Sequence, residues 1–378
     1  MPSRTVKILR TLALLAALFA FCIVMFGAFV RLSNAGLSCP DWPTCYGKAT
    51  WPGHAQDIAQ ANEAFPDRPY ETHKAWREQV HRFLAGGLGF MVLAIALVSA
   101  WRRRVAVIAV LLAAAFAVVG VVMYIRGEHV VSSCLSALAI ALPLIAAATL
   151  DRPGAWKIGV VALAVIIFQA MLGMWTVTLL LKPIVVMGHL LGGLATFALL
   201  AWAALRWWRV GTPDDRFAAL RTPVAIGIVV LVCQIALGGW TSSNYAAIAC
   251  PDFPKCQDRW LPETDYKDAF VLWRGLGVNY EGGVLQHPAR VAIHFTHRLG
   301  AVVATGALIY AVVATLRRKV RSGTRLAAFT VLGALGLQLL IGSSMVLKGF
   351  PLALATAHNA GAALLLLSSL ALYRALRH

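Results

Sequence analysis

The sequence has little charge for its length. Only 13% of its 378 residues are charged, whereas 60% are hydrophobic and the mean hydropathy is +0.73. In a soluble domain about a quarter of the residues are charged. The composition therefore excludes a soluble globular enzyme and a disordered chain. Several apolar stretches are instead long enough to cross a bilayer as helices. The sequence therefore predicts an all-α integral membrane protein.

Ten such stretches occur along the chain. The predicted spans are residues 11–31, 77–100, 105–125, 130–150, 158–181, 184–205, 223–243, 290–316, 326–347 and 351–373.

Acidic residues are especially scarce, with 16 Asp and Glu against 34 Lys and Arg. If the N-terminus lies inside, the inside segments hold 19 of the basic residues, Arg152 and Arg209 among them, but only the acids Asp151, Asp214 and Asp215. Membrane proteins concentrate Lys and Arg on the cytoplasmic side. The basicity thus predicts a multi-pass protein of the bacterial inner membrane with both termini cytoplasmic, rather than a nucleic-acid-binding protein.

Two long polar loops, 32–76 and 244–289, are then periplasmic, and they share a motif. Residues 39–45 read C-P-D-W-P-T-C and residues 250–256 read C-P-D-F-P-K-C, with a constant offset of 211. An oxidising exterior favours disulfides, so we predict one bridge inside each loop, Cys39–Cys45 and Cys250–Cys256. The pattern leaves open whether these bridges are structural or redox-active.

The repeat continues into the spans. A His-Arg pair follows each long loop, at His81-Arg82 and His297-Arg298. Later in each half a Gln, a Gly and a His recur at the same spacing, as Gln169, Gly173 and His189 in the first half and as Gln338, Gly342 and His358 in the second. We therefore predict two pseudo-symmetric four-helix bundles, residues 1–205 and 223–378, joined by a cytoplasmic linker over 206–222. The spans within 105–150 have no counterpart in the second half, so they form an inserted hairpin.

Histidine inside a membrane helix is costly and usually functional. His81, His189, His297 and His358 lie at similar depths below the outer ends of their spans, which gives one predicted pair in each bundle. Two imidazoles facing each other across an apolar bundle suit the axial coordination of a haem iron, whereas zinc prefers four ligands.

Glycine follows three of these histidines by three positions, at Gly192, Gly300 and Gly361. We expect these glycines to leave room for a porphyrin ring. Ordinary packing of small residues between membrane helices is the alternative.

Charged neighbours distinguish the two halves. Arg82 and Arg298 are candidate clamps for the haem propionates, or they extend to the lipid headgroups. Glu78 lies one helical turn before His81, where the second half has His294 before His297. A carboxylate beside a cofactor can act as a base, an acid or a cation stabiliser, so we predict chemistry in the first half. A purely structural role, in which Glu78 pairs with Arg77 or Arg82, is the alternative.

The assembled motifs resemble the haem A synthase family. The resemblance rests on residues 27–47 around the first loop, Glu78-x-x-His81-Arg82, residues 169–193 with His189, the segment His294 to Gly300, and His358. Members of this family have eight helices, so the hairpin over 105–150 is a departure, and its role is not implied.

The resemblance implies oxidation of the C8 methyl group of haem O to a formyl group, which gives haem A for cytochrome oxidase. It implies that His81 and His189 bind the substrate haem, that Glu78 takes part in the chemistry, and that His297 and His358 hold a haem b that relays electrons. Contacts with haem O synthase and oxidase assembly factors are expected at the family level, and the electron-transfer partner is not implied.

Two other functions fit parts of the pattern. A bis-histidine cytochrome b would pass electrons between quinol or thiols and a partner without modifying a haem. A duplicated transporter would use the histidines and Glu78 as a proton path and would bind no haem.

Overall fold

A computed structural model describes residues 4–150, 154, 156–207 and 215–377. Asp151, Arg152, Arg209 and Asp214, which the charge count places inside, lie outside these residues. So does the middle of the predicted linker 206–222.

Regular structure in the described part of the chain is helical. Ten helices among the described residues are long and apolar enough to cross a membrane. This confirms the predicted number, and every helix begins and ends within seven residues of its predicted bounds. They are α1 (Arg4–Leu32), α3 (Thr72–Ala100), α4 (Arg104–Ile125), α5 (His129–Thr149), α6 (Trp156–Thr178), α7 (Pro183–Trp207), α8 (Ala218–Ser243), α10 (His287–Leu316), α11 (Ser322–Leu347) and α12 (Leu352–Ala375).

The long loops carry two further helices that hydropathy does not reveal, α2 (Ala55–Ala64) and α9 (Tyr266–Ala269). Helix α2 follows the first disulfide loop, and Asp57 in its first turn pairs with Lys48 of that loop at 2.6 Å. The Asp265 side chain caps α9 by accepting hydrogen bonds from the backbone N–H groups of Lys267 and Asp268. Such local caps stabilise short helices outside the membrane.

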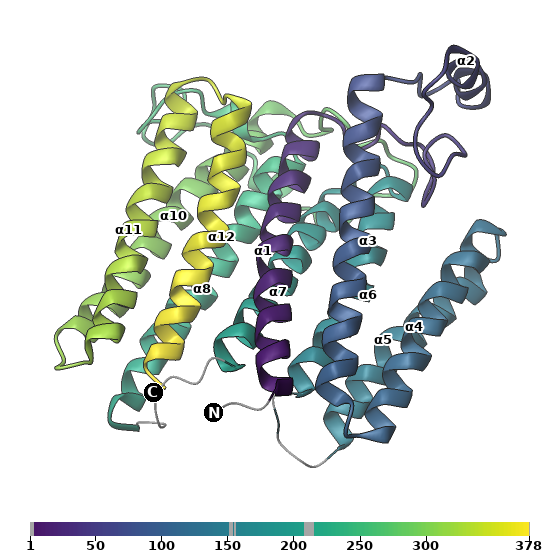
Figure 1. The fold of residues 1–378 in the computed structure, drawn as a ribbon. Coiled ribbons are helices and arrows are strands. Elements are labelled where there is room, and N and C mark those ends of the chain that lie inside the picture. Colours follow the sequence, from purple (N-terminus) through teal and green to yellow (C-terminus); the bar gives the residue numbers. More distant parts are fainter. Residues whose placement is uncertain (1–3, 151–153, 155, 208–214, 378) are drawn as a thin grey trace. The chain divides into compact units, whose positions relative to one another are not determined.

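The chain divides into two compact units, and helix α7 is shared between them. The first unit runs to Leu180 and includes the inner part of α7 from Gly192, whereas the outer part of α7, within Leu181–Leu191, belongs to the second unit. In the first unit α3 packs against α1 and α6, while α4 and α5 form the hairpin, which contacts α3 and α6 (Figure 1). The inner part of α7 contacts both α1 and α6, since Phe197 lies against Phe21 and Gly192 against Gln169.

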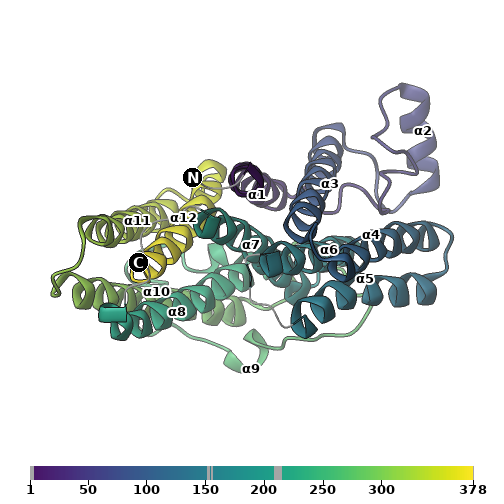
Figure 2. The same ribbon diagram turned by 60° about the horizontal axis from the view of Figure 1, so that its bottom comes forward.

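The second unit is a ring of four helices. Helix α8 packs against α10 and α12, and α11 packs against the same two helices. Figure 2 views this unit nearly end-on, with α11 and α12 in one row and α10 and α8 in the other. The ring therefore places α10 and α12, which carry His297 and His358, at opposite corners.

Candidate functional site

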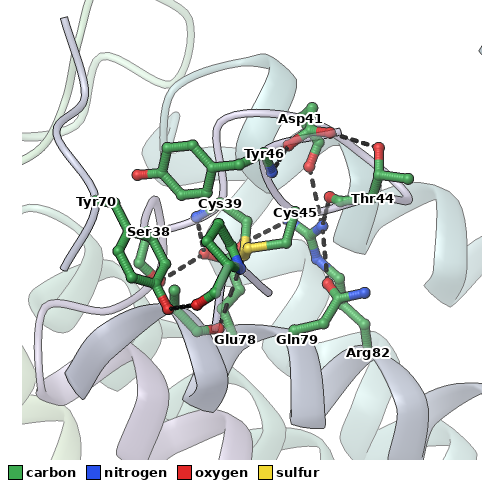
Figure 3. Close-up of a disulfide and its surroundings, with 12 residues drawn as sticks. Ser38, Cys39, Asp41, Thr44, Cys45, Tyr46, Tyr70, Glu78, Gln79 and Arg82 are labelled. Atoms are coloured by element: carbon green, nitrogen blue, oxygen red, sulfur yellow. Dashed lines mark hydrogen bonds and ion pairs between the residues drawn. A yellow bond between two sulfur atoms is a disulfide. The ribbon is translucent and has the colours of Figure 1, made fainter. Parts of the chain in front are cut away.

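The first disulfide loop is organised around one aspartate. Cys39 and Cys45 are bonded with an S–S distance of 2.01 Å, and between them Asp41 accepts hydrogen bonds from the backbone N–H of Tyr46 (2.6 Å) and Gly47 (2.9 Å) (Figure 3). Burial raises the pKa of Tyr46 to about 12, so its hydroxyl stays a donor, and it bonds to the carbonyl of Arg68 at 3.0 Å. The motif residues thus build a closed turn beside a small aromatic cluster.

The second loop repeats this arrangement. Cys250 and Cys256 are bonded at 1.97 Å, and Asp252 accepts from the N–H groups of Gln257 (2.6 Å) and Asp258 (2.9 Å). Burial alone would raise the pKa of Asp252, but these two N–H donors outweigh it and hold the pKa below its ordinary value. The aspartate of both motifs is therefore the acceptor that closes the turn.

Glu78 lies directly beneath the first loop and is 5% exposed. Its Oε1 atom accepts from Arg82 at 2.6 Å, and its Oε2 atom accepts from the backbone N–H of Cys39 at 2.9 Å and lies 3.1 Å from the Ser38 hydroxyl (Figure 3). A buried carboxylate is costly without such donors. The structure thus joins Glu78 to the disulfide-bonded loop as well as to Arg82.

The two arginines hold their loops in matching ways. Arg82 donates to the carbonyls of Asp41 (2.9 Å) and Thr44 (2.6 Å), and Arg298 donates to those of Cys250 (2.9 Å) and Lys255 (2.6 Å). Each guanidinium therefore fixes a disulfide loop to the helix below it, a role that the sequence does not reveal.

His294 takes the place of Glu78 in the second half. It is buried, and its Nε2 atom accepts from Arg298 Nε at 3.3 Å. Arg298 therefore links His294 to the second disulfide loop, and the choice of His297 rather than His294 as the ligand stays a prediction.

Three of the predicted ligand histidines lie against a glycine of the neighbouring helix. A methyl group added to Gly27, Gly238 or Gly342 would meet the Cε1 atom of the facing imidazole, at 2.7 Å in His81, 3.1 Å in His297 and 2.9 Å in His358. The glycines thus form a cradle in which each ring lies against bare backbone.

Half-buried glutamines accompany the cradles of the second unit. Gln234 Nε2 lies 3.0 Å from His297 Nδ1, and Gln338 Nε2 lies 3.4 Å from His358 Nε2. The Oε1 atoms of these glutamines fill the space beside Gly300 and Gly361. The expectation that these two glycines leave room for a porphyrin is therefore wrong, because glutamine carboxamides occupy that room.

The same holds in the first unit, where Gln169 Oε1 fills the space beside Gly192. By the offset of 169 residues that relates Gln169 to Gln338 and His189 to His358, Gly173 corresponds to Gly342.

His81 and His189 fall in different compact units, so their pairing remains a prediction from the repeat.

The inserted hairpin reaches the first loop. Its Tyr124 ring lies edge-on against Trp42 of the disulfide motif, with ring centroids 5.6 Å apart, and also lies near the ring of His129, 5.1 Å away. The hairpin thus supports the first loop, and the sequence of the second half has no counterpart of this hairpin.

Comparison with known proteins now bears on these residues. A family model described as Cytochrome oxidase assembly protein (COX15-CtaA) matches residues 10–150 and 128–370. The chain belongs to this family. As a COX15-CtaA member it has both disulfide loops, Glu78 and all four predicted ligand histidines within the matched segments.

Curated relatives of this COX15-CtaA chain align over most of its length. The protein named Heme A synthase in Shewanella oneidensis is 37% identical over 93% of the chain and 91% of its own length. Proteins of the same name in Rhizorhabdus wittichii and Caulobacter vibrioides are 24% and 25% identical, over 97% and 93% of the chain and 93% and 91% of their own lengths.

Proposed function

We propose that this protein is a haem A synthase, which oxidises the C8 methyl group of haem O to a formyl group and so supplies haem A to cytochrome oxidase. The observation that carries the proposal is the set of glycine-cradled histidines within a chain that aligns over 93% of its length with a protein of this name. Two successive hydroxylations of the methyl group, each adding the oxygen of a water molecule and releasing two electrons and two protons, give a geminal diol, which loses water to leave the formyl group. The four electrons pass to an external acceptor.

The second half, 223–378, holds a haem b in this proposal, with His297 and His358 as axial ligands. The donor set fits such a group: two imidazoles from opposite corners of the ring each lie against a glycine cradle. The haem b would relay the electrons removed from the substrate.

Gln234 orients the first of these ligands. If His297 Nε2 held the iron, the neutral imidazole would carry its proton on Nδ1. The Gln234 carboxamide would then turn its oxygen toward that proton and give up the hydrogen bond that its Nε2 atom donates to the His297 carbonyl at 2.9 Å. Such an outer hydrogen bond fixes the ring and raises the basicity of the ligand.

The first half, 1–205, binds haem O as the substrate, with His81 and His189 as axial ligands. Glu78 lies one turn of α3 from His81 and presents a carboxylate held by three donors. In this position it stabilises positive charge and accepts a proton as the methyl group is oxidised. Arg82 and Arg298 keep the loops closed over the two sites, and their predicted contacts with propionates remain to be tested.

The loops face the periplasm and both termini face the cytoplasm in this proposal, which the distribution of Lys and Arg supports.

Incubation of the purified protein with haem O and an electron acceptor, followed by chromatography of the extracted haems, tests the proposal. We expect haem A to accumulate with the wild-type protein and not with Glu78→Ala, which should still bind haem O. Stable haem O beside an intact haem b would instead support the electron-passing cytochrome, and a protein without Soret absorbance would support the transporter.

A further inference from the structure

Lys182 is a buried cation that the proposed function does not use. Its side chain is 1% exposed, and its Nζ atom has no hydrogen-bond partner among the described residues. Burial also lowers its pKa, because the charged form loses its hydration. A buried ammonium group is costly unless an anion accompanies it.

No carboxylate among the described residues accepts a hydrogen bond from Lys182. Its Nζ atom lies over the ring of Trp273, 3.4 Å from the centroid, and that ring is itself 59% exposed. Asp268, the carboxylate that lies close to Trp273 in the sequence, pairs with Arg274 at 2.5 Å. The tryptophan therefore covers the lysine toward solvent without neutralising it.

Lys182 directly precedes α7, and this position strengthens the case for a bound anion. Its carbonyl accepts from the N–H groups of Val185 (2.9 Å) and Val186 (3.1 Å), so it caps the first turn of the helix. A cation at a helix N-terminus is unfavourable because the helix dipole is positive there, whereas an anion is favourable. The lysine and the helix start would thus act together on an anion.

Helical geometry connects this charge with the predicted ligand His189. His189 lies seven positions after Lys182, a rotation that is within about 20° of two full helical turns. Both residues therefore lie on the same face, about 10 Å apart along the helix axis. The outer end of α7 is fixed there, since Ile184 and Met187 pack against the cluster around Trp240. A porphyrin bound through His189 could therefore turn its carboxylate edge toward Lys182.

The second half lacks this lysine. The offset of 169 that relates His189 to His358 places Pro351 at the position of Lys182, at the N-cap of α12. Two residues with positive φ precede the cap in both halves, Leu180 and Leu181 in one and Gly349 and Phe350 in the other, so the turn is shared and only the charge differs.

We propose that Lys182 binds a propionate carboxylate of the haem held by His189, and so distinguishes the substrate site from the haem b site. The inference rests on the proposed function, because it takes His189 as a ligand of haem O.

The test compares haem O with its dimethyl ester, in which both carboxylates are blocked. Each is titrated into haem b-loaded protein in phosphatidylcholine nanodiscs, and the Soret change gives Kd. Lys182→Met removes the charge and leaves an unbranched side chain that is one atom shorter. Lys348→Met is the matched control, because Lys348 is exposed in the equivalent connection before α12. Retention of the haem b spectrum reports correct folding.

We expect Lys182→Met to weaken binding of haem O by roughly 10-fold to 100-fold, the usual effect of losing one charge-assisted hydrogen bond. Binding of the ester should not change, and Lys348→Met should bind both forms as the wild type does. Equal losses for haem O and its ester, or no loss for either, would overturn the assignment of Lys182. Wild-type protein that binds neither form, or His189→Ala that binds both normally, would overturn the proposed function together with this inference.

Discussion

Replacing Gly342 by alanine should abolish low-spin haem b binding even though alanine favours the helix. The added methyl group would lie 2.9 Å from Cε1 of His358, whereas carbon atoms in contact are at least about 3.5 Å apart, so the ring must withdraw by roughly 0.6 Å. Ligands of a bound group must stay within about 0.5 Å of their productive position. The displacement therefore exceeds what axial coordination tolerates.

Gly336→Ala on the same helix is the matched control. A methyl group there meets no described atom within 4 Å, and both substitutions gain about 1 kcal/mol of intrinsic helix propensity. Any difference between the two variants therefore comes from the contact with His358.

Haem b content per polypeptide and the low-spin ferric EPR signal measure the effect, and thermal unfolding monitors the fold. We expect Gly336→Ala to match the wild-type spectrum and Gly342→Ala to lose the low-spin signal while remaining folded. A wild-type signal from Gly342→Ala would refute the cradle and, with it, His358 as a ligand.

Three further predictions concern the groups around the two sites. Glu78→Gln should keep both haems but slow haem A formation by about 10²-fold to 10⁴-fold, as expected when a general acid or base is lost, and an unchanged rate in the chromatographic assay would contradict its role. Gln234→Leu should raise the haem b midpoint potential by up to about 40 mV. The lost hydrogen bond contributes about 1 kcal/mol and stabilises the ferric state by making His297 more basic. A redox titration that gives no shift would argue against the contact between Gln234 and His297. Cys39→Ser should slow haem A formation more than Cys250→Ser, because only the first loop donates to Glu78, and equal losses in the two variants would exclude this coupling.

The membrane-spanning helices could be predicted from the sequence because each depends on a long apolar run. Helix α9 was not predicted because its residues are polar, although Asp265, which caps it, is a signal that the sequence contains. Helix α2 was not predicted either. Its Asp57 pairs with Lys48 of the preceding loop, a contact that the hydropathy of the sequence does not indicate.

Only part of the candidate site could be predicted from the sequence. Spacing along one helix identified Glu78, His81 and Arg82 as neighbours, and the structure pairs Glu78 with Arg82. The partners from other segments, such as the Cys39 N–H and the Gly27 backbone, depend on how the loop and α1 pack against α3. The repeated Gln and Gly four residues apart were visible as a motif, but only packing shows that Gly342 faces a histidine.

The most direct test of the central claim is to extract and chromatograph the pigments bound to detergent-purified protein from cells that make haem O. The account predicts haem b together with haem O or haem A in the wild type, and loss of haem b alone in His358→Ala. A correctly folded, colourless wild-type protein would contradict it.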